Sequence, residues 1–236
     1  MASQAQYVRA TGTTTLWLGP IQVHSVLIGR AVPFGRPGVS SAISKRPVEG
    51  PLVLGTIGLA GDEHGESVNH GGSEKAVLHY AMDHYQEWKS EHRGWEELLA
   101  QPGAFGENIA TMGMTEADVC VGDTYRLGAA LVQVSQPRRP CWRLNIRFGY
   151  ERMASEVQRT GRCGWYYRVI ETGSVGAGDS ISLTERPNPT WSLRRLLQGL
   201  SAHCADASEL STIASLPLLA DSMKTVARAR LEQMIS

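Results

Sequence analysis

A cysteine set among arginines and prolines is the residue of this chain best suited to chemistry. It lies in Ser-Gln-Pro-Arg-Arg-Pro-Cys-Trp-Arg, where Cys141 follows Pro140 and is flanked by Arg138, Arg139 and Arg143. Neighbouring positive charge favours a thiolate, and a thiolate is both a nucleophile and a soft metal ligand. The segment therefore marks Cys141 as a nucleophile or a metal ligand, without choosing between them.

The elements around Cys141 are predicted by hydrophobic spacing. Alternating apolar residues over 130–134 predict a strand, and Leu144 and Phe148 continue from the cysteine at helical intervals. Pro140 suits the first position of a helix, where a missing N–H costs nothing. We therefore expect Cys141 in the first helical turn, where the unpaired backbone N–H groups also favour a thiolate.

The remaining cysteines are Cys120, Cys163 and Cys204, and no two cysteines form a C-x-x-C pair. This spacing argues against a zinc knuckle, and a disulfide framework is unusual at this chain length. The simplest interpretation is reduced thiols in the cytoplasm. These three cysteines are then expected to be buried structural residues.

A second candidate is the glycine pair that ends the polar, glycine-rich loop 61–72. Gly71 and Gly72 follow His70, and paired glycines let the backbone approach a ligand and turn N–H groups toward an anion. The alternative is a tight turn with an exposed histidine. His64 and His70 are six residues apart, which fits a helical metal pair poorly.

A third candidate is the turn 103–108, which ends in Glu107 and Asn108. Asparagine tolerates left-handed backbone geometry and offers both a donor and an acceptor. The alternative is an ordinary turn into a strand.

A fourth candidate is the apolar run 165–170, which reads as a strand. Tyr166 and Arg168 are alternate residues and so share one face. Arginine grips phosphate well, but a surface arginine over a sheet explains the pattern equally.

The overall pattern predicts a mainly β protein with added helices. Many short strands at close spacing favour a barrel or sandwich over a doubly wound sheet. Two prolines at 187 and 189 mark a linker, after which three short helices are expected, with Thr190 and Asp206 as caps of the first two. About 45 residues could hardly fold alone, so these helices are expected to pack on the barrel or on a partner.

Composition excludes some partners. Lys plus Arg and Asp plus Glu number 23 each, so net charge points neither to nucleic acid nor to an anionic membrane. No apolar run approaches the roughly 20 residues that span a bilayer. The first dozen residues are expected to be a flexible tail rather than a signal peptide.

Five segments in a fixed order carry a family resemblance that none of them carries alone. They are Gly61-Asp62, His70-Gly71-Gly72, Phe105-Gly106-Glu107-Asn108, Ser135-Gln136-Pro137-Arg138-x-Pro140-Cys141 and Gly164-Trp165-x-Tyr167-Arg168-Val169. In this order they resemble the MOSC domain family, named for the C-terminal domain of molybdenum-cofactor sulfurases. The chain looks most like the stand-alone YiiM type, which carries a small three-helix tail. The resemblance runs from about residue 13 to the last helix.

The resemblance implies an α+β fold and a cofactor. The expected fold is a closed mixed β-barrel, like the barrel of pyruvate kinase, over 1–188, followed by a three-helix domain over 189–236. The expected cofactor is the molybdenum cofactor, a molybdopterin, with Cys141 as the protein ligand to molybdenum. A thiolate is a soft ligand, which agrees with this role.

The resemblance also suggests which residues surround the cofactor. Arg138 and Arg168 are candidates for its phosphate, on chemical grounds more than by motif. The glycine pair Gly71 and Gly72, with Asn108, is expected to line the same mouth.

Related proteins reduce N-hydroxylated compounds, such as 6-hydroxylaminopurine, other hydroxylamines and amidoximes. The implied reaction converts N–OH to N–H with two electrons and two protons. Glu107 or His70 is expected to supply protons beside Cys141. The sequence has no ferredoxin-like cysteine set and no G-x-G-x-x-G fingerprint, so the electrons are expected from a separate donor protein or reductant.

Two other classes of function remain open at this point. One is a sulfur-transfer or molybdenum-cofactor carrier protein that uses a Cys141 persulfide. The other is a non-catalytic module whose helical tail docks a redox partner. The sequence is compatible with a monomer or a dimer, and predicts neither a nucleic-acid nor a membrane partner.

Overall fold

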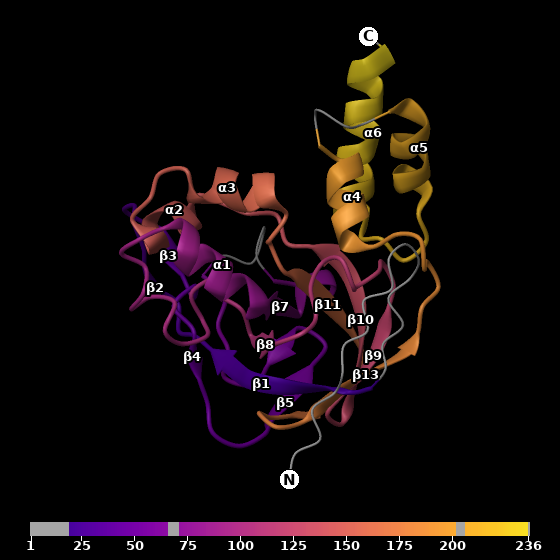
Figure 1. Ribbon diagram of the computed structural model, residues 1–236. Helices are drawn as coiled ribbons and strands as arrows, with labels where there is room; N and C mark the ends of the chain where they lie inside the picture. The colour runs from indigo at the N-terminus through magenta and orange to yellow at the C-terminus, as the bar shows by residue number, and fades with distance from the viewer. Residues whose placement is uncertain (1–18, 66–70, 202–205, 236) are drawn as a thin grey trace.

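The structure is a computed structural model, and it describes residues 19–65, 71–201 and 206–235. Its centre is a closed β-barrel (Figure 1). Seven strands form the ring in the order β13 (Ser180–Glu185), β9 (Thr124–Leu127), β10 (Ala130–Pro137), β11 (Trp165–Glu171), β7 (Val77–Ala81), β8 (Ile109–Thr111) and β1 (Ile21–Ile28). Pairing of β1 with β13 closes the ring. The β7–β8 pair is parallel and the other pairs of the ring are antiparallel, so the predicted closed mixed barrel is confirmed.

Smaller strands extend the barrel at its margins. β4 (Arg46–Pro47) pairs with β1, and β2 (Val32–Pro33) pairs with β3 (Ser40–Ser41). β5 (Leu52–Gly55), β6 (Gly58–Leu59) and β12 (Gly173–Val175) form a three-stranded sheet.

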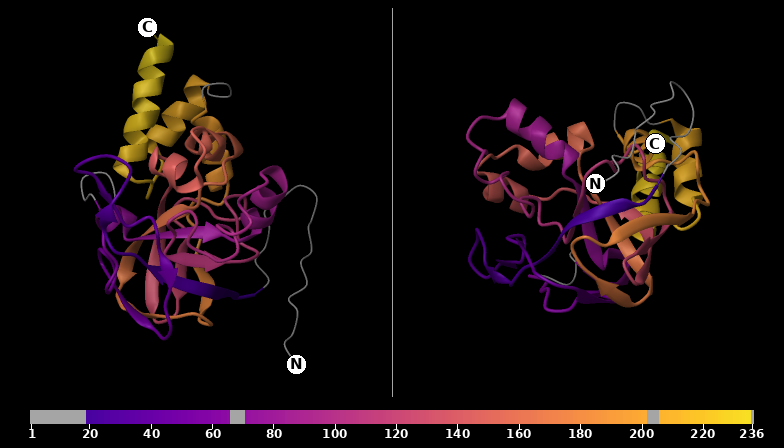
Figure 2. Two further views of the ribbon diagram at one scale, coloured as in Figure 1. Left: turned by 90° about the vertical axis from the view of Figure 1, so that its left-hand side faces the viewer. Right: turned by 60° about the horizontal axis from the view of Figure 1, so that its bottom comes forward.

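The helices form two separate groups, which all three views show (Figures 1 and 2). The first group is α1 (Asp83–Glu91), α2 (Arg143–Phe148) and α3 (Met153–Thr160), and a short 3-10 helix, η1 (Ser73–Lys75), precedes β7. The second group is α4 (Leu193–Gly199), α5 (Ala207–Ser215) and α6 (Asp221–Ile235). No helix in the described part of the chain is both long and apolar enough to cross a membrane.

Alternation along the strands fills the barrel. In β10, Ala130, Val132 and Val134 are buried while the residues between them are half-buried, as a strand with one inward face requires. The same apolar cluster continues into the second helix group through Trp191 and Leu196. The C-terminal helices therefore complete the core of the barrel rather than forming a core of their own.

The caps of the C-terminal helices differ in part from expectation. The Asp206 carboxylate accepts a hydrogen bond from the Glu209 N–H at 2.6 Å, as a helix N-cap does. For α4 the cap is Ser192 and not Thr190, because the Ser192 hydroxyl accepts from the Arg195 N–H at 3.2 Å. The first helix therefore begins later than its sequence suggests. The division of the chain at residue 188 into two domains stays a prediction.

Candidate functional site

A cavity of about 600 Å³, which includes the part open to solvent, lies at one end of the barrel. Its walls come from six separate stretches of chain: 40–45, 63–65, 71–78, 105–108, 138–143 and Tyr166. Cys141, Arg138, Asn108 and Gly71 all line it, so the fold brings four of the sequence-selected residues together.

The turn that presents Cys141 is not the helical turn expected. α2 begins at Arg143 with Trp142 as its N-cap, so Cys141 lies two residues before the helix. The prediction was wrong because the chain stays tied to the barrel beyond β10. The Arg138 N–H donates to the Gly164 carbonyl oxygen at 2.9 Å, so the turn into the helix comes after Cys141.

Arg138 is the most distinctive cation of the cavity. Its side chain is buried at 5% exposure, and its Nη1 has no hydrogen-bond partner among the described residues. Tyr166 lies close enough to feel the charges of both Arg138 and Cys141. Burial raises the pKa of Tyr166, while Arg138 acts in the opposite direction. A buried guanidinium nitrogen with no partner, beside a cysteine, fits an anionic group that the cavity receives.

Asn108 connects three elements and is fully engaged. Its Oδ1 accepts from the Leu78 N–H, while its Nδ2 donates to the Leu27 carbonyl and to Asp62 Oδ2 at 2.8 Å. It therefore fixes the cavity wall between β1 and β7 and holds Asp62 in place.

The Lys45–Asp62 ion pair is a feature that sequence reasoning missed. The Lys45 ammonium donates to both carboxylate oxygens of Asp62, with Nζ 2.6 Å from Oδ2. The two side chains are only 8% and 1% exposed, and Lys45 lines the cavity. Asp62 stood in a selected motif, but Lys45 lies in an irregular segment beside Ser44 and Arg46, where no local pattern singles it out.

Two arginines contact the ring of Trp142, which lies between the cavity residues Cys141 and Arg143 in the sequence. The guanidinium carbons of Arg36 and Arg143 lie 4.4 and 5.1 Å from the centre of the Trp142 ring. Arg143 also lines the cavity. These cation–π contacts hold the side chains of the cysteine segment in place and add positive charge to the site.

The charges of the cavity favour an anion. Lys45, Lys75, Arg138 and Arg143 line it, against one carboxylate, Glu63. Burial lowers the pKa of Lys75, and the nearby Arg139 lowers it further. Four cations and one carboxylate in the lining give the cavity an excess of positive charge, which favours an anionic ligand.

Glu107 has a different position from the one expected. Its side chain is fully buried and does not line the cavity. Its carboxylate accepts from the N–H groups of Gly103 and Phe105, at 2.7 and 3.0 Å, and from the Tyr85 hydroxyl. It therefore holds the turn that precedes Asn108, a geometry that gives no support to a proton-donating role.

Arg168 likewise lies outside the main cavity. Its guanidinium binds both oxygens of Glu74, the side chain of Gln133 at 2.7 Å and the Leu218 carbonyl at 2.9 Å. With Gly72 it lines a neighbouring hollow beside the start of α6. Arg168 therefore connects the barrel to the segment that leads into α6.

The glycine loop is only partly described. His70 lies outside the described residues. Gly71 has a φ of +105°, and a Cβ there would come 2.9 Å from the His64 ring. Both the backbone conformation and the close approach therefore require glycine at position 71.

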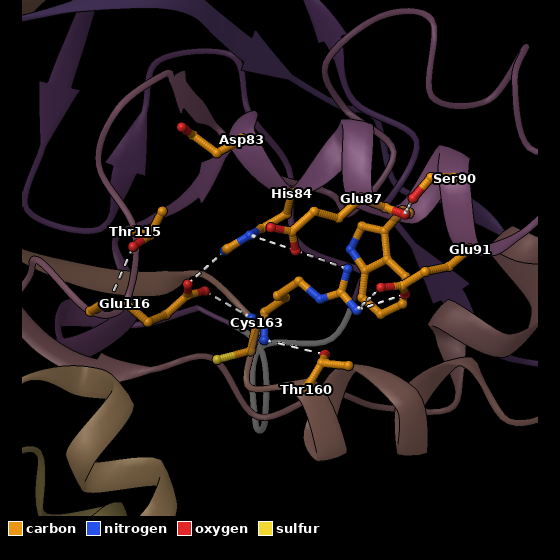
Figure 3. A network of polar contacts seen from close by, with 12 residues as sticks. Asp83, His84, Glu87, Ser90, Glu91, Thr115, Glu116, Thr160 and Cys163 are labelled. Carbon is orange, nitrogen blue, oxygen red and sulfur yellow. Dashed lines mark hydrogen bonds and ion pairs between the residues drawn. The ribbon is translucent and has the colours of Figure 1, made fainter. Parts of the chain in front are cut away.

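A network of polar contacts joins His84, Glu116 and Cys163 (Figure 3). The buried carboxylate of Glu116 accepts from the N–H groups of Cys163 and Gly164 and contacts His84 Nε2 at 2.7 Å. Burial alone would raise the pKa of Glu116, but the hydrogen bonds from His84 and Gly164 outweigh it and lower this pKa. Since the Gly164 carbonyl binds the Arg138 N–H, the network reaches the cavity wall.

The described residues contain no group of three or more His, Cys, Asp or Glu side chains able to hold a metal ion. Cys120, Cys141 and Cys163 form no disulfide, and burial raises the pKa of Cys120 to about 11 and that of Cys163 as well. These two are the buried structural thiols expected, while Cys204 lies outside the described residues.

The fold is the closed mixed barrel that the resemblance to the MOSC domain family implied, and a cysteine and several cations line its cavity. Comparisons with known proteins support the same family. The model of the MOSC domain matches residues 66–182. The protein YiiM of Escherichia coli strain K12 is 45% identical over 167 residues, which are 71% of this chain and 72% of that protein. The chain therefore belongs to the MOSC domain family, and within it to the YiiM type.

Two further relatives extend this result. The crystal structure of YiiM from Geobacillus stearothermophilus is 32% identical with a TM-score of 0.75, and the match covers 90% of this chain and 100% of that one. A protein of Gibberella moniliformis called "Reductase" is 42% identical over 194 residues, which are 82% of this chain. The match spans only 34% of that relative's length.

Proposed function

We propose that this protein is a molybdenum-cofactor-dependent reductase of N-hydroxylated compounds, such as hydroxylaminopurines and other hydroxylamines. The observation that carries the proposal is the partnerless Nη1 of buried Arg138 in one cavity with Cys141. A soft thiolate suits molybdenum, and an unsatisfied guanidinium suits the phosphate of a pterin cofactor. Membership of the MOSC family and a relative called "Reductase" support the same assignment.

The residues present fit such a cofactor. Cys141 would ligate the metal, while Arg138 and Arg143 would hold the phosphate, and Gly71 would let the pterin approach the backbone. When bound, the cofactor supplies two-electron redox chemistry at a metal. The two electrons would come from a separate reduced protein in the cytoplasm.

The protein's own contribution is placement and charge. Arg138 and Arg143 neutralise the anion, and the Trp142 ring stacks with Arg143 so that its guanidinium keeps one orientation. Asn108 fixes another part of the cavity wall, because each of its polar atoms is bound. Preorganised groups of this kind lower the cost of binding and of positioning a substrate.

The test is the metal and pterin content of the full chain, produced in a host that makes the cofactor. We expect close to one molybdenum per chain, and loss of both metal and turnover in Cys141→Ser. Cys163→Ser is the matched control, because that thiol is buried and does not line the cavity, and it should keep the metal.

Two results would contradict the proposal. One is full metal occupancy and turnover in Cys141→Ser. The other is a protein without molybdenum whose Cys141 peptide carries an added sulfur by mass spectrometry, which would favour the sulfur-carrier alternative.

A further inference from the structure

Lys45 lines the cavity and has a fixed carboxylate partner. Its Nζ is held by both oxygens of Asp62, and Asp62 is itself fixed by the Gly29 N–H and by Asn108 Nδ2, each at 2.8 Å. The ammonium therefore sits at a defined point of the cavity wall, on a rigid support. A proton donor needs this kind of placement, because the transfer distance decides the rate.

The partner of Lys45 also argues against a role as an anion anchor. Asp62 already compensates its charge at 2.6 Å, whereas Nη1 of Arg138 has no partner among the described residues. An incoming anion therefore gains more from Arg138 than from Lys45.

We propose that Lys45 is the proton donor of this site and that Asp62 is its positioning residue. The proposal rests on the proposed function, and it names a residue for which the sequence pattern gave no signal. Lys45 replaces Glu107 in this role, since the Glu107 carboxylate is occupied by the turn 103–107.

The reaction balances as R–NH–OH + 2 e⁻ + 2 H⁺ → R–NH₂ + H₂O. The N–O bond breaks, the nitrogen is reduced, and a reduced electron-donor protein or a chemical reductant is oxidised. The departing oxygen takes its proton from the Lys45 ammonium and leaves as water, and the nitrogen takes the second proton from solvent. Solvent then reprotonates the Lys45 amine, which Asp62 holds in place.

The electrostatics of the cavity suit a lysine that gives up a proton. Burial lowers the pKa of Lys45, although Asp62 and Glu107 raise it in part. The other titratable groups that line the cavity with it are Glu63, His64, Lys75, Arg138, Cys141, Arg143 and Tyr166. The carboxylate of this set, Glu63, is held by Arg30 at 2.7 Å and by the Ala31 N–H at 2.8 Å, which leaves it poorly placed to compete as a donor.

A first experiment needs no turnover. The chain has four lysines, so ¹³Cε-lysine labelling gives four side-chain resonances, and Lys45→Arg assigns the one from Lys45. In the full chain we expect the Lys45 resonance to titrate below the ordinary lysine value and to move lower still in Asp62→Asn, which removes the compensating charge. A Lys45 resonance that titrates as an ordinary lysine in both proteins overturns the proposal.

A second experiment uses the loaded enzyme. Lys45→Arg keeps the positive charge but holds its proton too tightly to donate it, and a lost general acid typically costs about 10² to 10⁴ in rate. We expect this loss in kcat, with KM and molybdenum content retained. The wild-type kcat should fall as pH rises through the Lys45 pKa, and that fall should move to lower pH in Asp62→Asn. Lys89→Arg, on α1 away from the cavity, is the matched control and should match wild type.

The outcomes separate this proposal from the one it rests on. Wild-type protein without molybdenum or turnover contradicts the proposed function. An active wild type with unchanged kcat and pH profile in Lys45→Arg overturns the role of Lys45 alone. Loss of molybdenum in Lys45→Arg, in protein that keeps the wild-type melting temperature, would make Lys45 an anchor and would also overturn the proposal.

Discussion

Glu116 and Gly164 are 48 residues apart in the sequence, and the Gly164 N–H donates to Glu116 Oε1 at 2.7 Å. The carbonyl of the same glycine accepts from the Arg138 N–H. Gly164 therefore links the buried Glu116 carboxylate to the segment that carries Cys141.

Glu116→Ala should destabilise the fold by about 3 kcal/mol, because two buried N–H groups lose their acceptor. Urea unfolding measures this. Glu87→Ala is the matched control, since the Glu87 side chain is 59% exposed and its ion pair with Arg162 is worth at most about 1 kcal/mol. Equal losses in the two variants would contradict the anchoring role of Glu116.

His79 should make stability depend on pH. Burial lowers its pKa from the ordinary 6.5 to about 3, so between these values the unfolded chain binds a proton that the folded chain refuses. Above about pH 6.5, His79 therefore leaves the free energy of unfolding independent of pH. As pH falls from about 6.5 toward about 3, the free energy of unfolding decreases by roughly 1.4 kcal/mol per pH unit. Urea unfolding at pH 7 and pH 5 should show a smaller difference in His79→Gln than in wild type, while exposed His24→Gln should keep the wild-type difference.

Arg138 and Arg168 should separate binding from stability. Arg138→Ala should lower the pterin content of purified protein at least about tenfold, because a charged hydrogen bond is worth about 1.5–3 kcal/mol. Arg168→Ala should keep the cofactor but lower the free energy of unfolding, since it releases the contacts to Glu74 and Leu218. Pterin fluorescence and urea unfolding measure the two effects. Loss of cofactor in a stably folded Arg168→Ala would reverse the assignment.

Gly71→Ala should impair the cavity through strain and through the His64 ring. Backbone strain at a positive φ costs about 1–3 kcal/mol. Gly72→Ala is the matched control, because φ at position 72 is +89° and the same strain applies there. An added Cβ at position 72 would have nothing within 4 Å, so this variant has no steric contact. The larger loss of cofactor should therefore occur in Gly71→Ala. Adding His64→Ala should restore part of it, and a double mutant no better than Gly71→Ala would rule out the contact.

Alternation and turn residues are local signals, so they predicted many short strands but left a barrel and a sandwich open. The closed mixed barrel, now confirmed, was implied by the family resemblance. The errors of the sequence prediction come from long-range contacts. Pro140 favours the first turn of a helix, but the hydrogen bond between Arg138 and Gly164 ties this segment to the neighbouring strand, and the helix begins only after Cys141. Thr190 and Ser192 are both residue types that cap helices well, but α4 begins at Leu193 and its N-cap is Ser192.

The site shows the same limit. Glu107 and Asn108 are neighbours in sequence, yet only Asn108 lines the cavity, because successive residues at a strand entrance point to opposite sides. Lys45 carried no signal at all. Its importance arises from Asp62, which lies 17 residues away in sequence and meets it only in the folded chain.

The apolar cluster that runs from Val132 in the barrel to Leu196 and Ile213 in the C-terminal helices has a thermodynamic consequence. Elements that share one core lose their packing together, so barrel and helices should unfold in a single cooperative transition. Calorimetry should then give equal calorimetric and van't Hoff enthalpies for the whole chain. Removal of the helices would expose apolar residues of the shared core, and the shortened chain should then associate through them.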